Sequence, residues 1–191
     1  MITAILLAAG QSKRLKNENK LIKLFKKKLL INYILSSLIK SKVNKIIIVL
    51  GFEHLKVKKK LLKSKKIKFV INKNYKKGIS SSIKTGLRSL SKRNKGFLIV
   101  QADMPNITKT TINKIILLIN KSPKEIFLPR FKNRVGNPIG FKKSMIKNIN
   151  KIKGDRGAKN IIKKNSKKIK FVNINSKSIL TNFNTKKDFS S

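Results

Sequence analysis

The sequence predicts an α/β fold built on a parallel sheet. Short apolar runs rich in Ile, Val and Leu alternate with longer amphipathic stretches along the whole chain, and this alternation is typical of β–α–β units. No internal repeat and no Pro- or Gly-rich linker interrupts the pattern. A length of 191 residues suits one domain, so we expect residues 1–191 to form a single domain.

Strands and helices are expected in alternation, beginning with a strand at 3–7, an apolar run that ends at a turn of small residues. Further apolar or β-branched runs predict strands at 45–50, 67–72, 97–101, 125–129, 137–141 and 169–173. Amphipathic stretches predict helices at 29–40, 54–63, 81–90, 109–120, 144–149 and 158–164. Thr108 is a suitable N-cap for the helix at 109–120.

The charge balance is extreme, with 49 Lys and Arg residues against 6 Asp and Glu and a formal net charge of +43. This charge alone suggests a polycationic nucleic-acid-binding protein, which stays open as an alternative. The cations are spread along the chain and are mostly Lys, and Asn and Ile are also abundant. These three residue types have A/T-rich codons, so we interpret the charge as compositional bias and expect no specific nucleic-acid partner.

The sequence also lacks the features of other function classes. Because there is no Cys, thiol nucleophiles, thiolate zinc sites and disulfides are excluded. No apolar run approaches the ~20 residues of a membrane span, and residues 1–7 have no basic flank of the signal-peptide kind. We therefore expect a cytoplasmic protein with no membrane partner.

The most informative segment is the turn after the first strand, which carries Gly10, Ser12, Arg14 and Lys20. Gly10 lets the backbone come close to a ligand. Successive backbone N–H groups and the two cations can then donate to an anion. A glycine turn followed by a solvated basic loop is the ordinary alternative. The pattern predicts a phosphate site at the end of the first strand, where α/β sheets bind nucleotides.

Two places in the chain offer oxygen ligands for a metal ion. Asp103 follows the strand at 97–101, and a carboxylate at that sheet edge faces the same crevice as the opening turn and suits Mg²⁺. Asn182 and Asn184 lie on one side if their segment is extended, and their amides are weaker, neutral ligands. The ordinary alternative for Asp103 is a turn that its side chain stabilises. For Asn182 and Asn184 it is a polar turn in an Asn-rich chain.

Three further segments combine a glycine turn with hydrogen-bonding side chains: Gly78-Ile-Ser80-Ser81-Ser82, Arg134-Val-Gly136-Asn137-Pro138 and Gly154-Asp155-Arg156-Gly157-Ala158. The first leads into a helix, whose free N–H groups can bind a base edge, a ribose or a phosphate. The Arg in each of the other two can clamp an anionic group. A helix N-cap or a hairpin turn is the ordinary alternative in each case.

Taken in order, these segments resemble the MobA-like nucleotidyltransferases, and most closely the molybdenum cofactor cytidylyltransferases. The opening loop of that family reads L-A-A-G-x-S-x-R-M-G-x-x-K. The residues that match it here are Leu7, Ala8, Ala9, Gly10, Ser12, Arg14 and Lys20. Leu15 and Lys16 replace the Met-Gly pair of the family.

Later motifs of the family match as well. Its glycine-and-serine loop corresponds to 78–82, its D-x-P to 103–105, its R-x-G-[HN]-P to 134–138 and its G-D-x-G-A to 154–158. The cytidylyl branch usually carries D-x-D-T-P near its end, whereas Asn182 and Asn184 resemble the N-x-N-T-P of the guanylyl branch. The Ala8-Ala9 pair resembles the cytidylyl branch, because the guanylyl branch tends to have Gly-Gly there.

The resemblance implies a Rossmann-like three-layer α/β/α nucleotidyltransferase fold with a mostly parallel central sheet, and it implies roles for the matching residues. Catalytic roles fall to Arg14, Lys20 and Asp103, and Mg²⁺ ligation to Asp103, Asn182 and Asn184. Nucleotide binding falls to Leu7, Ala8, Ala9, Gly10, Ser12, Arg14, Lys20, Gly78, Ser80, Ser81 and Ser82. Acceptor binding falls to Arg134, Gly136, Asn137, Pro138, Asp155 and Arg156.

The activity implied by the resemblance is transfer of CMP from CTP to the phosphate of molybdopterin, with release of pyrophosphate and handover of the product to a molybdoenzyme or a chaperone. Alternatives within the enzyme class are the use of GTP and transfer to another phosphorylated acceptor, such as a sugar or polyol phosphate. A family member that binds nucleotide without turnover is a further alternative, because of the Lys16 and Asn replacements.

Overall fold

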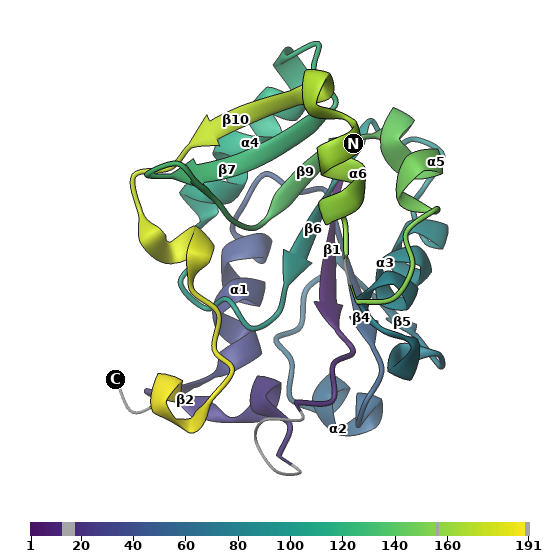
Figure 1. Ribbon diagram of the computed structural model, residues 1–191. Helices are drawn as coiled ribbons and strands as arrows, with labels where there is room; N and C mark the ends of the chain where they lie inside the picture. Colours follow the sequence, from purple (N-terminus) through teal and green to yellow (C-terminus); the bar gives the residue numbers. More distant parts are fainter. Residues whose placement is uncertain (13–17, 156, 190–191) are drawn as a thin grey trace.

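A computed structural model describes residues 1–12, 18–155 and 157–189 of the chain, and they form three layers with the sheet in the middle (Figure 1). Residues 13–17, 156 and 190–191 lie outside the described part. Two predicted site residues, Arg14 and Arg156, are among them, so their placement stays a prediction.

The central sheet has the strand order β10-β7-β9-β6-β1-β4-β5, with β8 paired to β7. The bounds of these strands are Ile169–Asn173 (β10), Ile126–Phe131 (β7), Ile139–Lys142 (β9), Gly96–Gln101 (β6), Ile2–Ala8 (β1), Lys45–Leu50 (β4), Ile67–Ile71 (β5) and Arg134–Val135 (β8). β6, β1, β4 and β5 are parallel to one another, as are β7 and β10. The mostly parallel sheet is therefore confirmed.

Two strands depart from the parallel arrangement: the short β8 is antiparallel to β7, and β9 runs antiparallel to both of its neighbours, β6 and β7. Only residues 132–138 join β7 to β9, and they include the short strand β8. A parallel connection needs a crossover of about a dozen residues or more, so this short link forces the chain to reverse.

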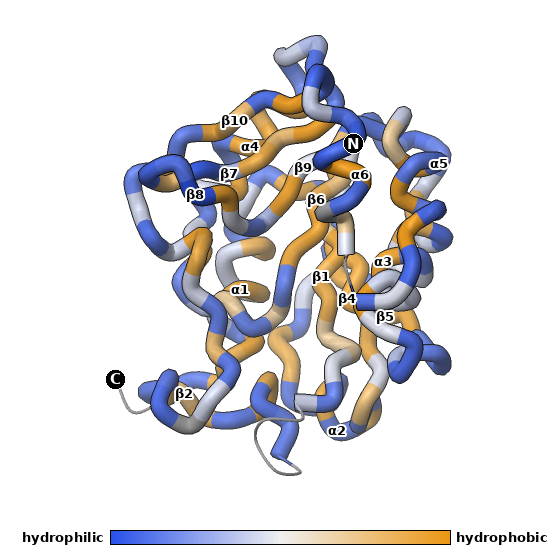
Figure 2. The backbone as a smooth tube through the Cα atoms, viewed as in Figure 1, coloured by the Kyte–Doolittle hydropathy of each residue, from blue (hydrophilic) through white to orange (hydrophobic). Residues whose placement is uncertain are grey.

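Helices cover both faces of the sheet, because alternate residues of each strand point to opposite faces. Ala4, Leu6 and Ala8 of β1 belong to one hydrophobic cluster, which includes apolar residues of α1 (Leu30–Ile39), α2 (His54–Lys59) and α4 (Lys109–Lys121). Ile5 belongs to the second cluster, with residues of α3 (Ile79–Arg88), α5 (Ile146–Ile149) and the partly buried face of α6 (Lys159–Lys164). Figure 2 shows the resulting pattern, with hydrophobic central strands and hydrophilic peripheral loops.

Local sequence explains where α4 begins and why α3 packs closely on the sheet. Thr108 caps α4 as expected, since its side chain accepts a hydrogen bond of 3.2 Å from the backbone N–H of Thr111. α3 lies close against the sheet because Gly86 faces Ile5 and Val49, and a Cβ atom at that position would collide with Ile5. The close approach holds α3 against β1 and β4.

Several short elements are not apparent from sequence periodicity. A two-stranded hairpin joins β2 (Leu24–Phe25) to β3 (Lys28–Leu29), apart from the main sheet. Six 3₁₀ turns are described as well: Lys20–Ile22 (η2), Tyr75–Lys77 (η3), Lys143–Met145 (η4), Ser166–Lys168 (η5), Lys177–Leu180 (η6) and Lys186–Phe189 (η7).

After β10, the C-terminal segment runs back past the sheet to the β2 hairpin (Figure 1, yellow). An aromatic cluster anchors it there. The Phe183 ring centroid lies 4.7 Å from that of Phe25 and 5.6 Å from that of Phe189, and Phe183 is buried beside Leu30. This anchor brings Asn184 next to the end of β6.

Among the described residues, the helices are all too short or too polar to cross a membrane.

Candidate active site

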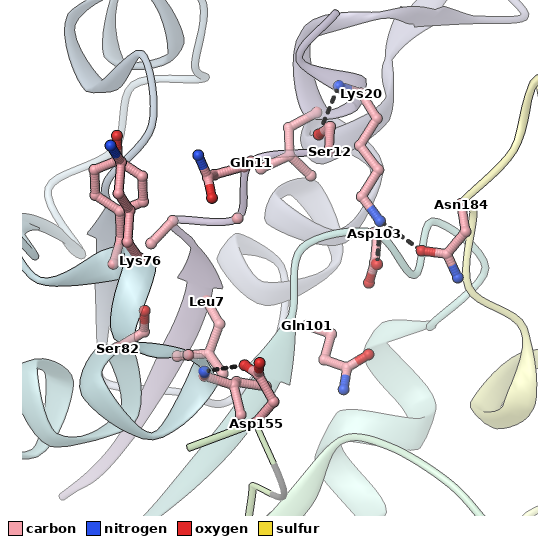
Figure 3. A pocket seen from close by; sticks show the side chains of 16 residues that line it. Leu7, Gln11, Ser12, Lys20, Lys76, Ser82, Gln101, Asp103, Asp155 and Asn184 are labelled. Carbon is pink, nitrogen blue, oxygen red and sulfur yellow. Dashed lines mark hydrogen bonds and ion pairs between the residues drawn. The ribbon is translucent and has the colours of Figure 1, made fainter. Parts of the chain in front are cut away.

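A cavity of about 580 Å³ opens at the carboxyl ends of β1 and β6, a size typical of small-molecule sites. Ten residues predicted from the sequence line it: Leu7, Ala9, Gly10, Ser12, Lys20, Gly78, Ser82, Asp103, Asp155 and Asn184. They come from segments far apart in the chain, and Figure 3 shows several of them around the same space. The fold therefore gathers most of the predicted nucleotide and metal residues in one place.

Pairing of β1 with β6 brings the glycine turn and the acid together. The two strands are parallel with Leu7 opposite Gln101, and the register ends with the backbone N–H of Ala102 donating to the carbonyl of Leu7 at 3.3 Å. Gly10 and Asp103 follow these two ends and both line the cavity. The crevice expected between them exists.

A lysine, an aspartate and an asparagine form the polar centre of the cavity. The Lys20 ammonium donates to Asp103 Oδ2 at 2.6 Å and to Asn184 Oδ1 at 2.8 Å (Figure 3). It also donates to the backbone carbonyl of Phe183 at 3.0 Å. The side chains of Lys20 and Asp103 are only 15% and 16% exposed, so this ion pair is shielded from solvent more than a surface pair.

The C-terminal segment is held in register with this centre by hydrogen bonds of its own. The Phe183 N–H donates to the Asp103 carbonyl at 2.9 Å. The Asp188 carboxylate accepts from the backbone N–H groups of Asn184 and Thr185, each at 2.7 Å. The Asn184 N–H, followed by that of Thr185, lowers the pKa of Asp188 below its ordinary value. Asp188 therefore fixes the backbone that presents the Asn184 amide to Lys20.

The oxygen atoms of this centre fit a hard divalent cation. Asp103 Oδ1 is buried and has no hydrogen-bond partner among the described residues, so it is available as a ligand. Carboxylate, amide and carbonyl oxygens are the ligands that Mg²⁺ accepts. The described residues hold no group of three or more His, Cys, Asp or Glu side chains arranged for a metal. A cation here would therefore depend on a bound phosphate or water for the rest of its ligands.

The glycine loop before α3 is joined to the loop before α6. Gly78 has a φ of +93°, which favours glycine. The Ile79 N–H donates to Asp155 Oδ1 at 2.9 Å, and the Ser80 N–H donates to the Gly154 carbonyl at 3.1 Å. Two of the predicted glycine segments therefore form one wall of the cavity, with the Asp155 carboxylate at the N-terminus of α3 (Figure 3).

The serines of the first turn of α3 face different ways. Ser82 lines the main cavity, and its hydroxyl accepts from the Asn72 amide at 3.0 Å. Ser80 and Ser81 line a separate cavity of about 300 Å³ instead. The Ser81 hydroxyl is turned to the backbone, 2.8 Å from the Gly78 carbonyl.

Other predicted site residues do not line the main cavity. Ala8 is buried in the core, and Asn182 is exposed on the C-terminal segment. The segment from Arg134 to Pro138 lies at the turn between β7 and β9, where the Asn137 N–H donates to the Ile179 carbonyl at 2.9 Å. Gly136 packs directly against the same carbonyl. Of the two predicted acceptor segments, 134–138 therefore lies outside this cavity, whereas Asp155 of the segment 154–158 lines it.

Six lining residues were not singled out from the sequence: Gln11, Leu21, Tyr75, Lys76, Ile79 and Gln101. A positional signal existed for three of them. Gln11 stands inside the opening motif, Ile79 inside the predicted segment 78–82, and Gln101 ends the strand that delivers Asp103. Tyr75 and Lys76 belong to a 3₁₀ turn, for which the sequence carries no periodic signal.

Comparisons with known proteins match the chain to a family model and to solved structures. The family model described as MobA-like NTP transferase domain matches residues 4–169. A search of curated protein sequences found no match.

Solved structures with the same fold are numerous. Rv0371c from Mycobacterium tuberculosis superposes with a TM-score of 0.85 at 20% identity, covering 99% of this chain and 95% of that chain; another structure of that protein is a complex with manganese. A Methanothermobacter nucleotidyl transferase has a TM-score of 0.84 at 17% identity, covering 100% of this chain and 94% of the other. The 4-diphosphocytidyl-2C-methyl-D-erythritol synthase of Anaerococcus prevotii has a TM-score of 0.79 at 16% identity, covering 99% and 92%.

Proposed function

We propose a specific reaction for this chain, which belongs to the MobA-like NTP transferase family and carries a nucleotidyltransferase domain. The chain transfers CMP from CTP to the phosphate of a molybdopterin-type acceptor. Pyrophosphate is the second product, and Mg²⁺ is the metal. The observation that carries the proposal is the single cavity with the Gly10 turn on one wall and the Lys20–Asp103–Asn184 centre on another.

The triphosphate lies between the turn at 10–12 and Lys20. Backbone N–H groups of a glycine turn and a lysine ammonium are suitable donors for phosphate oxygens. Arg14 adds a bidentate donor to the same group. The acceptor phosphate is already an anionic nucleophile, so the protein needs no strong general base. Its residues align the acceptor with the α-phosphate and offset negative charge.

Asp103 and Asn184 would hold the metal ion, because their oxygens border the cavity and Asp103 Oδ1 has no hydrogen-bond partner in the part of the chain that the structure describes. When bound, Mg²⁺ supplies charge neutralisation at the phosphates. Asn182 is exposed, so of the two asparagines Asn184 is the better candidate ligand. The manganese complex of Rv0371c supports divalent-metal binding on this fold.

The base and ribose lie against Ala9, Gly78 and Ser82, which line the cavity; Ser82 is across the cavity from Asn184 (Figure 3). The Ala8-Ala9 pair, which resembles the cytidylyl branch, supports CTP over GTP. The A. prevotii structure, named as a diphosphocytidyl synthase, supports a cytidylyl substrate on this fold. The same structure also supports a polyol phosphate as an alternative acceptor. Asp155 borders the cavity, and we assign it to the acceptor.

One assay tests the proposal. Purified protein with Mg²⁺ is given each of the four NTPs together with molybdopterin, a sugar phosphate or a polyol phosphate, and pyrophosphate is measured. We expect release with CTP and molybdopterin. Release only with a sugar or polyol phosphate, or only with GTP, would reassign the substrate. Nucleotide binding without release from any pair would identify a non-catalytic member of the family.

Nucleic-acid binding is measured in parallel because of the charge of +43. Weak, sequence-independent binding that falls steeply with salt is expected from charge alone. It would indicate a nucleic-acid function only if pyrophosphate release and nucleotide binding were both absent.

A further inference from the structure

The Lys20 ammonium occupies a site made entirely of oxygen atoms. Its three contacts are Asp103 Oδ2 at 2.6 Å, Asn184 Oδ1 at 2.8 Å and the Phe183 carbonyl at 3.0 Å. An ammonium has three donors, so each has a protein oxygen here. The site is a cation site that is already filled by a cation of the chain itself.

The oxygen atoms of this site are also the ones that suit a divalent metal ion. A carboxylate, an amide and a carbonyl are hard ligands, and the second oxygen of Asp103 has no partner among the described residues. Lys20 and a metal ion would therefore compete for Asp103 and Asn184. Two cations a few ångströms apart repel strongly at a site shielded from water, so they cannot share these oxygens at low cost.

The base of Lys20 is fixed, whereas its ammonium can move. The Lys20 N–H donates to the Ser12 hydroxyl at 3.1 Å, which ties the backbone of η2 to the glycine turn. The lysine stem is flexible, and the proposed triphosphate lies in the same cavity. Phosphate oxygens would offer the ammonium new acceptors while leaving Asp103 and Asn184 to the metal ion.

We propose that Lys20 closes the metal site of the nucleotide-free protein and makes metal binding depend on the nucleoside triphosphate. This inference rests on the proposed function, because it takes the nucleotide as the group that draws Lys20 away. It assigns Lys20 a role beyond phosphate binding. The ammonium neutralises the shielded Asp103 carboxylate until the metal ion and nucleotide arrive together, and by linkage each then favours binding of the other.

The test is a titration with Mn²⁺ in the absence of nucleotide, followed by electron paramagnetic resonance and by calorimetry. The variant Lys20→Met removes the competing ammonium. Lys76→Met is the matched control, because Lys76 lines the same cavity and its loss changes the net charge equally. Lys76 has no ion pair or hydrogen bond with Asp103 among the described contacts.

We expect Lys20→Met to bind Mn²⁺ at least about tenfold more tightly than the wild type, since the repulsion of one nearby cation is removed. Lys76→Met should stay within about threefold of the wild type, because its charge is exposed and screened. Equal Mn²⁺ affinities for wild type and Lys20→Met would overturn the inference. An equal gain in both variants would do the same, because it would trace the effect to net charge.

Folding and nucleotide binding are checked separately. If Lys20→Met does not fold, as judged by circular dichroism, Lys20→Gln is titrated with the same expectation, since its amide keeps a donor without the charge. Binding of a non-hydrolysable CTP analogue to the wild type is measured in its own titration. No binding of the analogue would contradict the proposed function, whereas the Mn²⁺ comparison in nucleotide-free protein would still decide whether Lys20 blocks the metal.

Discussion

Replacing Asp103 by Asn is the sharpest perturbation of the site, because it removes one charge and keeps the shape of the side chain. In the structure, one oxygen of Asp103 accepts from Lys20 at 2.6 Å, and the other is buried with no partner among residues 1–12, 18–155 and 157–189. The amide can turn its oxygen to Lys20 and its NH₂ group to the cavity. Lys20 keeps its contacts with Asn184 and Phe183, so we expect the variant to fold.

The substitution should lower turnover more than it lowers the stability of the fold. A hydrogen bond to a charged group contributes about 1.5–3 kcal/mol, and Lys20 keeps a neutral version of it, so the free energy of unfolding should fall by about 1–2 kcal/mol. Loss of the one carboxylate in the centre should cost more in turnover. By analogy with the removal of other electrostatic stabilisers, kcat should fall by roughly 100-fold or more, which corresponds to about 2.7 kcal/mol.

The assay is continuous detection of pyrophosphate with saturating CTP, acceptor and Mg²⁺. Thermal unfolding of the same preparation serves as the control for folding. Near-normal turnover in a folded Asp103→Asn protein would refute the assignment of this carboxylate to the metal. A loss of turnover that matched a loss of folded protein would show only a structural role.

Three further changes test the supports of the site. Gly78→Ala places a Cβ atom 2.5 Å from an Asp155 oxygen at a φ of +93°; it should cost about 2 kcal/mol and raise the KM for CTP, and an unchanged KM would argue against this wall. Thr108→Ala removes the cap of α4 and should lower the free energy of unfolding by about 1 kcal/mol with kcat unchanged, as measured by denaturant unfolding. Asp188 has a lowered pKa, so its ionised form stabilises the turn around Asn184 at neutral pH, and that stability is lost as the pH falls through the lowered pKa. The gap in unfolding free energy between wild type and Asp188→Asn should thus be constant above about pH 5 and close below the ordinary value of 3.8; a gap that persisted in acid would contradict this reasoning.

Sequence patterns predicted the long elements well, because hydrophobic burial determines them. The strands observed at 45–50 and 169–173 have the expected bounds, since the apolar run of the first ends at Gly51 and that of the second at Asn173. The hairpin of β2 and β3 was missed. Each of its strands has two residues, and its turn uses Lys26 at a φ of +51°, where no glycine marks the bend. The antiparallel direction of β9 follows from its short connection to β7. Hydrophobic periodicity carries no information on strand direction.

The candidate site was also predictable from the sequence only in part. The Gly10 turn and Asp103 could be placed together because both follow parallel strands that pair side by side. The orientation of single side chains was beyond the sequence. Asn184 lines the cavity while Asn182 is exposed, and the difference depends on how the aromatic cluster around Phe183 anchors the segment. A contact of that kind joins residues more than 150 positions apart and has no local signal.

A crystal structure of the protein with CTP and Mg²⁺ would test the assigned site most directly. We expect the triphosphate between the backbone of the Gly10 turn and Asp103, with the metal ion on Asp103 and the Lys20 ammonium moved onto phosphate oxygens. A nucleotide bound elsewhere, such as in the basic cavity beside Lys84 and Arg88, would contradict it.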